Sequence, residues 1–150
     1  MKAEFEISDL GNLSYFIGIE FSRTKAGILI NQKKYASDVL KRFQLEDCNS
    51  VSTPSEVGNK IDALEGDKVV DKTFYRQMIG CLRYVYNTRL DIAYGIGVVS
   101  RHMESPKKSD LLAAKRLLRY VNGTIDFGLV LPNKLCILNQ TMLEFSDVEW

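Results

Sequence analysis

The first apolar positions of the chain form two short runs of the kind found in β-strands. LSYFIGIEF (13–21) is rich in aromatic and β-branched residues, and ILI (28–30) follows it after the polar, turn-prone stretch SRTKAG. Two such runs joined by a short polar connection predict a β-hairpin. Gly18 interrupts the first run, which indicates a bulge or a close approach of the backbone to a neighbouring group.

The spacing of apolar residues becomes helical after the second run. Asn31 can cap a helix that extends to about Phe43 and carries Tyr35, Val39 and Leu40 on its apolar side. Residues 44–71 lose this period and collect Asp, Glu, Ser and Gly. That composition predicts a long acidic linker or loop.

Three further helices are predicted between residues 71 and 123. The first begins at Asp71 or Thr73, and the second begins near Asp91, which is a good N-cap residue. The third begins at Ser105–Pro106, where proline is tolerated, and stops at Asn122–Gly123. The inward positions predicted for the first two of these helices are Phe74, Met78, Leu82 and Val85, and then Ile92, Ile96, Val99 and Met103.

The last part of the sequence switches to short strand-like runs, FGLVL, LCIL and MLEFSD. The sequence stops at Trp150 within the last run, and a strand edge left unpaired is unfavourable, so we expect a truncated chain. The predicted fold class is α+β, with an N-terminal β-hairpin, a bundle of about three to four helices and short C-terminal antiparallel strands. The sequence is predicted to divide into a hairpin with a following helix (1–43), an acidic linker (44–71), a helical region (72–124) and C-terminal strands (125–150).

The composition excludes several classes of protein. Of the 150 residues, 45% are hydrophobic and 26% are charged, which excludes a disordered tail and a collagen-like repeat. No apolar run reaches the length of about 18 residues that spans a membrane, and the acidic N-terminus lacks the apolar core of a signal peptide. Cys48, Cys81 and Cys136 are odd in number and far apart, as in a reducing compartment. We therefore expect an intracellular protein, cytoplasmic or nuclear, without a membrane partner.

The net charge of +1 conceals a strong segregation of charge. Residues 72–122 contain ten Lys and Arg against three Asp and Glu, and residues 23–42 contain six against one. Residues 43–71 have the opposite sign, with two against seven. A long basic block is typical of a surface that binds a polyanion such as nucleic acid. A solvated helical face is the alternative.

The helix predicted after Asp71 offers the most informative candidate surface. Gly80 lies between Arg76 and Tyr84 at i, i+4, i+8 spacing, and forms a flat notch flanked by a guanidinium and a phenol ring. A nucleic-acid backbone or groove could lie in that notch, whereas the alternative is that Gly80 lets another helix pack closely. The polar side of this helix comprises Thr73, Arg76, Gln77, Gly80, Arg83, Tyr84 and Asn87, and the last predicted helix adds Lys107, Lys108, Lys115, Arg116 and Arg119, with a solvated face as the alternative.

Catalytic and metal-binding chemistry have little support in the sequence. His102 is the single histidine and has no nucleophile in a recognisable motif, so we interpret it as a structural or surface residue. The cysteines lack the spacing of a zinc site. Asp147 and Glu149 lie two apart on a predicted strand and could share a cation, with an exposed strand edge as the alternative.

Several ordered blocks of the sequence are similar to one known family. Over nearly its whole length the chain resembles the C-terminal part of the reverse transcriptase of copia-type LTR retrotransposons, running into the start of RNase H. The similar blocks are SDLGNLSYFIGIEF (8–21), GILINQKKYASDVLKRF (27–43), VSTP (51–54), FYRQMIGCLRYVYNTRLDIAYGIGVVSRHM (74–103), AAKRLLRYVNGT (113–124) and FSDVEW (145–150).

The resemblance implies a role for each of these regions. The hairpin would grip the primer end, and the helix after Asp71 would be a thumb helix that tracks the minor groove of the template–primer. FSDVEW would be the first strand of RNase H, in which Asp147 matches the first metal-binding aspartate. From the resemblance and the charge pattern together, the residues expected to bind nucleic acid are Phe16, Ile17, Gly18, Arg76, Gly80, Arg83, Tyr84, Lys108, Lys115, Arg116 and Arg119, the last four and Arg83 as flanking positive charge.

The chain departs from the family pattern at several positions. Leu90 and Asp110 stand where proline and histidine are usual, and Glu149 stands where the RNase H block usually has aspartate. The paired polymerase aspartates would precede Met1, and the rest of RNase H would follow Trp150. Two-metal phosphoryl chemistry needs several converging carboxylates, so we expect no catalysis and no cofactor for this chain, and Mg²⁺ only in the intact parent enzyme.

The expected function is that of a retrotransposon polyprotein fragment with at most residual binding of an RNA/DNA duplex through phosphates. Two alternatives stay open. The chain could be a gene relic without function, or an interaction protein that associates with intact reverse transcriptase or with itself and interferes with the enzyme.

Overall fold

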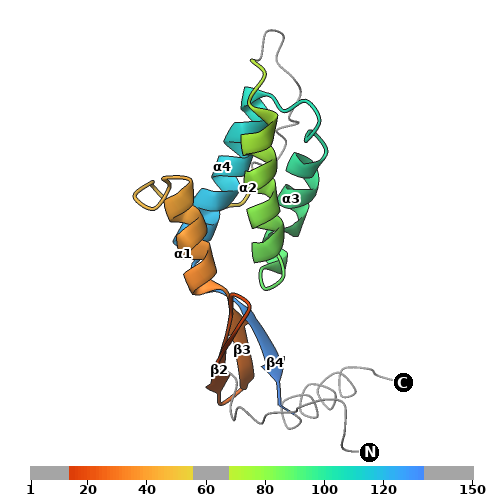
Figure 1. The fold of residues 1–150 in the computed structure, drawn as a ribbon. Coiled ribbons are helices and arrows are strands. Elements are labelled where there is room, and N and C mark those ends of the chain that lie inside the picture. Colours follow the sequence, from red (N-terminus) through yellow and green to blue (C-terminus); the bar gives the residue numbers. More distant parts are fainter. Residues whose placement is uncertain (1–13, 56–67, 134–150) are drawn as a thin grey trace, which may run out of the picture.

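The computed structural model describes residues 14–55 and 68–133. The helices gather at one end of this part of the molecule and a small sheet lies at the other (Figure 1). The described part of the chain begins in the sheet, forms four α-helices and returns to the sheet with its last strand. The α+β class predicted from the sequence is confirmed.

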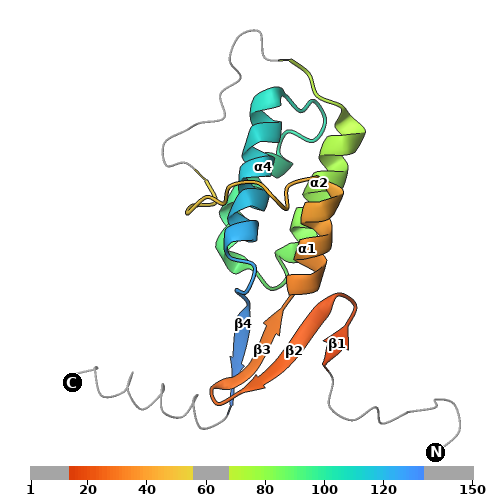
Figure 2. The ribbon, with the colours of Figure 1, turned by 90° about the vertical axis from the view of Figure 1, so that its left-hand side faces the viewer.

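The sheet has four antiparallel strands in the order β1-β2-β3-β4 (Figure 2). They are β1 Tyr15–Phe16, β2 Ile19–Thr24, β3 Gly27–Asn31 and β4 Leu129–Pro132. Strand β4 overlaps the predicted FGLVL run (127–131), extends one residue beyond it to Pro132 and pairs with β3. The runs LCIL and MLEFSD, which were also predicted as strands, lie outside the described residues.

A tight turn divides the first predicted strand into β1 and β2. Phe16 pairs with Ile19, which leaves Ile17 and Gly18 as a two-residue connection with φ values of 49° and 77°. Positive φ at both positions is typical of a type I′ turn, whose twist suits the flanking antiparallel strands. The prediction of a continuous strand is therefore wrong, because the positive φ of Gly18 serves a chain reversal.

Four α-helices occupy the predicted segments. They are α1 Lys33–Arg42, α2 Lys72–Val85, α3 Ala93–Ser100 and α4 Lys108–Gly123, and the 3₁₀ turn η1 Leu90–Ile92 precedes α3. Asp71 caps α2 as predicted, since its carboxylate accepts the backbone N–H of Thr73 at 3.1 Å.

The other helix starts differ from the prediction. Asn31 is the last residue of β3 and pairs with Glu20, so Gln32 takes the position before α1. The side-chain oxygen of Asn31 still accepts the backbone N–H of Lys33, the first helical residue, at 3.5 Å. Asp91 lies inside η1 and does not cap α3. Helix α4 begins at Lys108, two residues beyond the predicted proline.

The described parts of the predicted linker, residues 44–55 and 68–71, contain no helix or regular strand. They nevertheless pack onto the helices. Leu45 is buried, and Val69 forms an isolated antiparallel bridge with Lys107. Both described parts of this segment therefore contact the helical bundle or its connections.

Helices α2 and α4 pack against each other at the centre of the bundle. Both α1 and α3 contact each of these two central helices, and α1 and α3 lie on opposite sides of α2 (Figure 1). The outward surfaces of α2 and α4 consequently face opposite sides of the bundle. The apolar core fills the space between the helices and includes Met78, Leu82, Val85, Ile92, Ile96, Val99, Leu117 and Val121, with Met103 partly buried against it.

One inward position of α2 was predicted wrongly. Phe74 is 37% exposed and packs edge-on against Phe43, with ring centroids 5.6 Å apart. Tyr75 and Ile79 occupy the core instead. Tyr75 can be fully buried because its hydroxyl donates to the carbonyl oxygen of Val99 at 2.6 Å, and burial raises its pKa.

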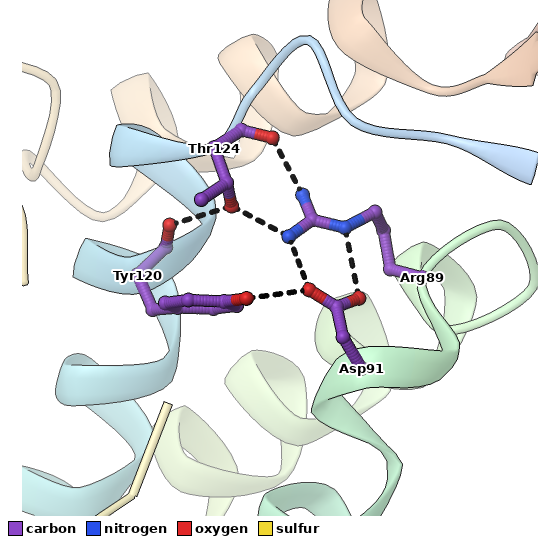
Figure 3. Close-up of polar contacts among 4 residues, drawn as sticks. All are labelled: Arg89, Asp91, Tyr120 and Thr124. Atoms are coloured by element: carbon purple, nitrogen blue, oxygen red, sulfur yellow. Dashed lines mark hydrogen bonds and ion pairs between the residues drawn. The ribbon is translucent and has the colours of Figure 1, made fainter. Parts of the chain in front are cut away.

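A buried guanidinium joins the start of α3 to the end of α4 (Figure 3). Arg89, only 4% exposed, donates to both carboxylate oxygens of Asp91 at 3.0 and 2.8 Å. It also donates to the carbonyl and hydroxyl oxygens of Thr124, and Tyr120 donates to Asp91 at 2.8 Å. Burial acts to raise the pKa of Asp91, but the hydrogen bonds from Arg89 and Tyr120 outweigh it and lower that pKa. Both oxygens of this carboxylate therefore accept hydrogen bonds within the fold, from Arg89 and Tyr120.

Candidate nucleic-acid interface

The side of α2 opposite the core carries the residues that the sequence selected as a candidate surface. All of them are exposed except Tyr84, which is partly buried. The helical period explains this placement, because the apolar positions of α2 point to α3 and α4 and leave the remaining positions outside. We refer to these residues as the α2 face: Thr73, Arg76, Gln77, Gly80, Arg83, Tyr84 and Asn87.

Gly80 lies at the centre of the α2 face and is open. A Cβ atom placed on Gly80 meets no described atom within 4 Å. The alternative that Gly80 permits close helix packing is therefore wrong for the described part of the chain. Gly95 of α3 does serve that purpose, since a Cβ there would lie 2.5 Å from Cδ2 of Leu117 on α4.

Arg76 and Lys72 share one carboxylate at the α3 side of the α2 face. Lys72 binds Glu104 with an N–O distance of 2.7 Å, and the guanidinium of Arg76 pairs with the other oxygen of the same carboxylate. The hydrogen bond from Lys72 and the charge of Arg76 hold the pKa of Glu104 below its ordinary value. The group is exposed, so the pairing is open to competition from a solvent-borne anion.

Tyr84 connects the α2 face to the turn between β1 and β2. Its hydroxyl donates to the carbonyl oxygen of Ile17, and a Cβ atom on Gly18 would lie 3.3 Å from Cε1 of its ring. The ring also packs edge-on against Tyr35 of α1, with centroids 4.7 Å apart. The structure thus brings together two groups of predicted residues: those at the turn between β1 and β2, and those of α2.

The hairpin tip is exposed where it meets α2. Phe16 is 55% exposed and Ile17 is 66% exposed. We refer to Phe16, Ile17 and Gly18 as the hairpin tip. Together with the α2 face it makes one continuous candidate surface, with apolar side chains at one end and Arg76 at the other.

Two cations of α1 border this surface and were not predicted. Arg42 donates to the side-chain oxygen of Gln77 at 3.4 Å, and the ammonium of Lys34 lies 5.5 Å from the ring centre of Tyr15 on β1. The net positive charge of residues 23–42 was the available signal. It was not assigned to the site because only the packing of α1 beside α2 reveals its position.

The basic residues of α4 lie elsewhere. Lys108, Leu112, Lys115, Arg116 and Arg119 form the outward side of α4, which we refer to as the α4 face. Arg119 donates to the carbonyl oxygen of Asn49 at 2.8 Å, and Arg116 donates to the hydroxyl of Thr53 at 2.9 Å. The segment after α1 therefore runs across α4 (Figure 2). This arrangement differs from the expected one, in which the α4 cations flank the α2 face, because the two faces point to opposite sides of the bundle.

Comparison with known proteins decides the family. A family model described as reverse transcriptase (RNA-dependent DNA polymerase) matches residues 1–57. The retrovirus-related Pol polyprotein from transposon RE1 of Arabidopsis thaliana is 33% identical over 150 residues, which cover all of this chain and 10% of that protein. The chain belongs to the family of transposon Pol polyproteins. The resemblance drawn from the sequence blocks is confirmed.

Two further relatives of this Pol-family chain differ in length. An uncharacterized mitochondrial protein of Arabidopsis thaliana is 34% identical over 151 residues, which cover the whole chain and 61% of that protein. The Pol polyprotein from transposon TNT 1-94 of Nicotiana tabacum is 34% identical over 133 residues, 83% of this chain and 10% of that protein. The chain spans about a tenth of the length of the transposon polyproteins that it matches. No solved structure matches it.

Two residues at which this Pol-family chain departs from the expected pattern have defined environments. Asp110 is 2% exposed; its carboxylate accepts the backbone N–H of Lys107 at 2.8 Å and lies 2.5 Å from Nδ1 of His102. Asp110 is therefore part of the helix start, and not an acid on the basic α4 face. The pairing agrees with a structural role for His102. Leu90 is exposed at the start of η1.

The remaining candidate chemistry of the Pol-family chain concerns metals and membranes. Asp147 lies outside the described residues. Within residues 14–55 and 68–133, no group of three His, Cys, Asp or Glu side chains is placed to hold a metal ion. Over the same ranges, no helix combines the length and apolar character needed to cross a bilayer.

Proposed function

We propose that this reverse-transcriptase-like chain binds an RNA/DNA duplex of the template–primer kind through the hairpin tip and the α2 face, without catalysing polymerisation or RNA cleavage. This proposal rests on the open strip of the α2 face around Gly80, where a Cβ atom would meet no described atom within 4 Å. Tyr84 joins this strip to the hairpin tip. A helix without a side chain at its centre lets a nucleic-acid backbone approach closely. The flanking arginines supply charge to its phosphates.

Charge placement supports a backbone-binding mode. Arg76 and Arg83 lie on the α2 face, and Arg42 and Lys34 border it from α1. With these cations around the open backbone at Gly80, phosphate contacts would dominate and affinity would be largely independent of sequence. The exposed Phe16 and Ile17 would contact sugars or the end of the duplex.

The proposed lack of catalysis rests on the carboxylates. Two-metal phosphoryl transfer needs several carboxylates around two cations, and Asp147 is the one residue that the resemblance matches to such a ligand. A Mg²⁺ ion held by Asp147 would belong to the chemistry of a longer parent enzyme. We expect no primer extension and no cleavage of an RNA/DNA hybrid with Mg²⁺ or Mn²⁺; activity that Asp147→Asn abolishes would contradict this.

Binding is tested with a fluorescent RNA/DNA hybrid, Gly80→Leu and the matched control Gly80→Ala. Wild-type affinity should fall linearly on a log–log plot against salt, because phosphate binding releases counterions. Gly80→Leu fills the open strip and leaves every charge in place, and we expect affinity to fall about tenfold or more, a change of about 1.4 kcal/mol. Gly80→Ala, with a far smaller side chain, should bind within about threefold of wild type.

The outcomes separate the alternatives. No affinity of the wild-type chain for the hybrid at low salt would overturn the proposal and favour a gene relic. Equal affinity of Gly80→Leu and wild type would place binding away from the α2 face. Binding to intact reverse transcriptase, with no affinity for the hybrid, would favour the interaction protein. Circular dichroism and urea unfolding of each variant show whether the fold is retained.

A further inference from the structure

We propose that Tyr84 is a positioning residue, which fixes the strained Ile17–Gly18 turn against α2 so that the hairpin tip and the α2 face present one rigid surface. This inference rests on the proposed duplex binding for its functional consequence. Its structural part concerns the free protein and is tested there.

The turn has a conformation that its sequence does not favour. Ile17 has a φ of 49°, a value that is rare for a β-branched residue, since its branched Cβ crowds the backbone. Two-residue turns with positive φ at both positions prefer Asn-Gly or Asp-Gly. Ile17 is also 66% exposed, so burial of its side chain does not compensate the strain. Another interaction must hold the turn in place.

Tyr84 supplies that interaction from a distant part of the chain. Its hydroxyl donates to the carbonyl oxygen of Ile17, 67 positions earlier in the sequence. Its ring lies against Gly18, where a Cβ atom would approach Cε1 to 3.3 Å. The backbone of the turn is thus held by a hydrogen bond at one residue and by a ring at the next.

The ring of Tyr84 is itself fixed. Tyr35 packs edge-on against it with an interplanar angle of 69°. Tyr35 is partly buried against the core, and this burial, followed by the neighbouring Cys81, raises its pKa to about 12. The turn, α2 and α1 therefore meet at one aromatic pair, and strain of this kind persists only where surrounding structure determines it fully.

This geometry assigns Tyr84 a role different from that of Arg76 or Gly80. Its hydroxyl is engaged by Ile17, so the duplex would meet the turn that Tyr84 holds and not the phenol oxygen. A positioning residue changes how ordered the hairpin is before any ligand binds. A direct phosphate contact changes the salt dependence of binding instead.

The test is Tyr84→Phe, which removes the hydroxyl and keeps the ring, with Tyr94→Phe on the exposed side of α3 as the matched control. Amide hydrogen exchange of the free protein should become about fivefold to tenfold faster across residues 15–21 in Tyr84→Phe, as expected for loss of one hydrogen bond. Tyr94→Phe should leave these rates unchanged. Unchanged exchange in Tyr84→Phe would overturn the inference.

A second variant tests whether Tyr84 acts by restraining the strain in the Ile17–Gly18 turn. Ile17→Asn gives the turn a residue that tolerates positive φ, so Tyr84→Phe should accelerate exchange less in the Ile17→Asn background than in wild type. An equal acceleration in both backgrounds would show that Tyr84 does not act by restraining a strained turn.

Measurement of duplex affinity tests whether the interaction of Tyr84 with the turn contributes to binding. Tyr84→Phe should weaken binding of the RNA/DNA hybrid about threefold to tenfold and leave the slope of log affinity against log salt unchanged, because no phosphate contact is lost. A slope reduced by about one unit would identify Tyr84 as a direct phosphate contact and overturn the positioning role. If the wild-type protein does not bind, the proposed function fails by itself, whereas the exchange result still decides whether Tyr84 holds the turn.

Discussion

The α2 face and the α4 face both carry arginines on the outward side of a central helix, but their surroundings differ. Each carries cationic side chains at helical spacing on the outward side of a central helix. On α2 the strip around Gly80 is open and continues into the hairpin tip. On α4 two arginines donate to Asn49 and Thr53 of the segment that crosses the helix. On α4 the basic residues bind the chain's own carbonyl and hydroxyl oxygens, whereas on α2 we propose that they bind an external polyanion.

The largest expected effect concerns the arginines of the α4 face. In the double variant Arg116→Ala and Arg119→Ala the segment at residues 49–53 loses two hydrogen bonds from charged donors. We expect the free energy of unfolding, measured in urea, to fall by about 2–3 kcal/mol. Affinity for the RNA/DNA hybrid should change less than about threefold.

The charge-matched control is Lys108→Ala with Lys115→Ala on the same face. This variant also removes two positive charges and should change the free energy of unfolding by less than about 0.5 kcal/mol. The comparison between the two faces would break if both α4 variants weakened binding strongly and equally, with stability unchanged.

The second prediction is the reverse experiment on the α2 face. Arg76→Ala with Arg83→Ala should weaken duplex binding about tenfold and reduce the salt slope by about one to two units, because up to two phosphate contacts are lost. Surface substitutions of this kind should move the free energy of unfolding by about 0.5 kcal/mol or less. A salt slope equal to that of wild type would exclude both arginines as phosphate contacts.

A third prediction contrasts two helical glycines. Gly95→Ala introduces a Cβ atom 2.5 Å from Cδ2 of Leu117, which is itself buried. Overpacking of about 1–3 kcal/mol is only partly offset by a gain of about 1 kcal/mol in helix propensity, so we expect a lower thermal midpoint. Gly80→Ala meets no described atom and should raise that midpoint by the equivalent of about 0.5–1 kcal/mol. Equal shifts of the same sign would remove the distinction between a packing glycine and an open one.

The smallest expected effect comes from Glu104, which pairs with Lys72 and Arg76 and would compete for them with a bound phosphate. Glu104→Gln should tighten duplex binding about twofold to threefold by releasing these cations. The pKa of Glu104 is lowered in the folded protein. Its contribution to stability is therefore present above its ordinary pKa of 4.5 and is lost as the pH falls through the lower, folded value. Unfolding of wild type and Glu104→Gln should differ above pH 4.5 and converge in acid; a constant difference would contradict this.

The periodic signals in the sequence predicted the helices well because each helix buries one side. Met78, Leu82 and Val85 of α2 are all in the core, and Gly80 is on the opposite side. The prediction of an inward Phe74 is wrong because Tyr75 enters the core, where its hydroxyl donates to the carbonyl oxygen of Val99. A side chain with a polar end is interpreted from sequence as an outward residue unless its partner is known.

The site was predicted less completely because it is assembled from distant segments. The residues of the hairpin tip and of the α2 face were both predicted from the sequence. Their junction at Tyr84 and Ile17 was not, because it depends on packing between residues far apart in the chain. Gly18 was expected in a bulge or at a close approach of the backbone to a neighbouring group. It lies in a chain reversal, and the close approach is confirmed, since a Cβ atom there would lie 3.3 Å from Cε1 of Tyr84. The arginines of α4 were assigned to nucleic acid because nothing in a helical stripe reveals that Asn49 and Thr53 accept their hydrogen bonds.

The pairing of β3 with β4 has a consequence for how the chain folds. Strands β1, β2 and β3 join through short turns, whereas β4 comes about a hundred residues after β3, and closing so long a loop costs conformational entropy. Non-local pairing of this kind is slow compared with local contacts, so the three-stranded meander should form early and β4 should be added after the helices have brought the strand ends together. A nascent chain whose synthesis stops after α4 would present the free edge of β3 to other strands. During translation, the interval before β4 emerges is therefore the period of greatest exposure to aggregation.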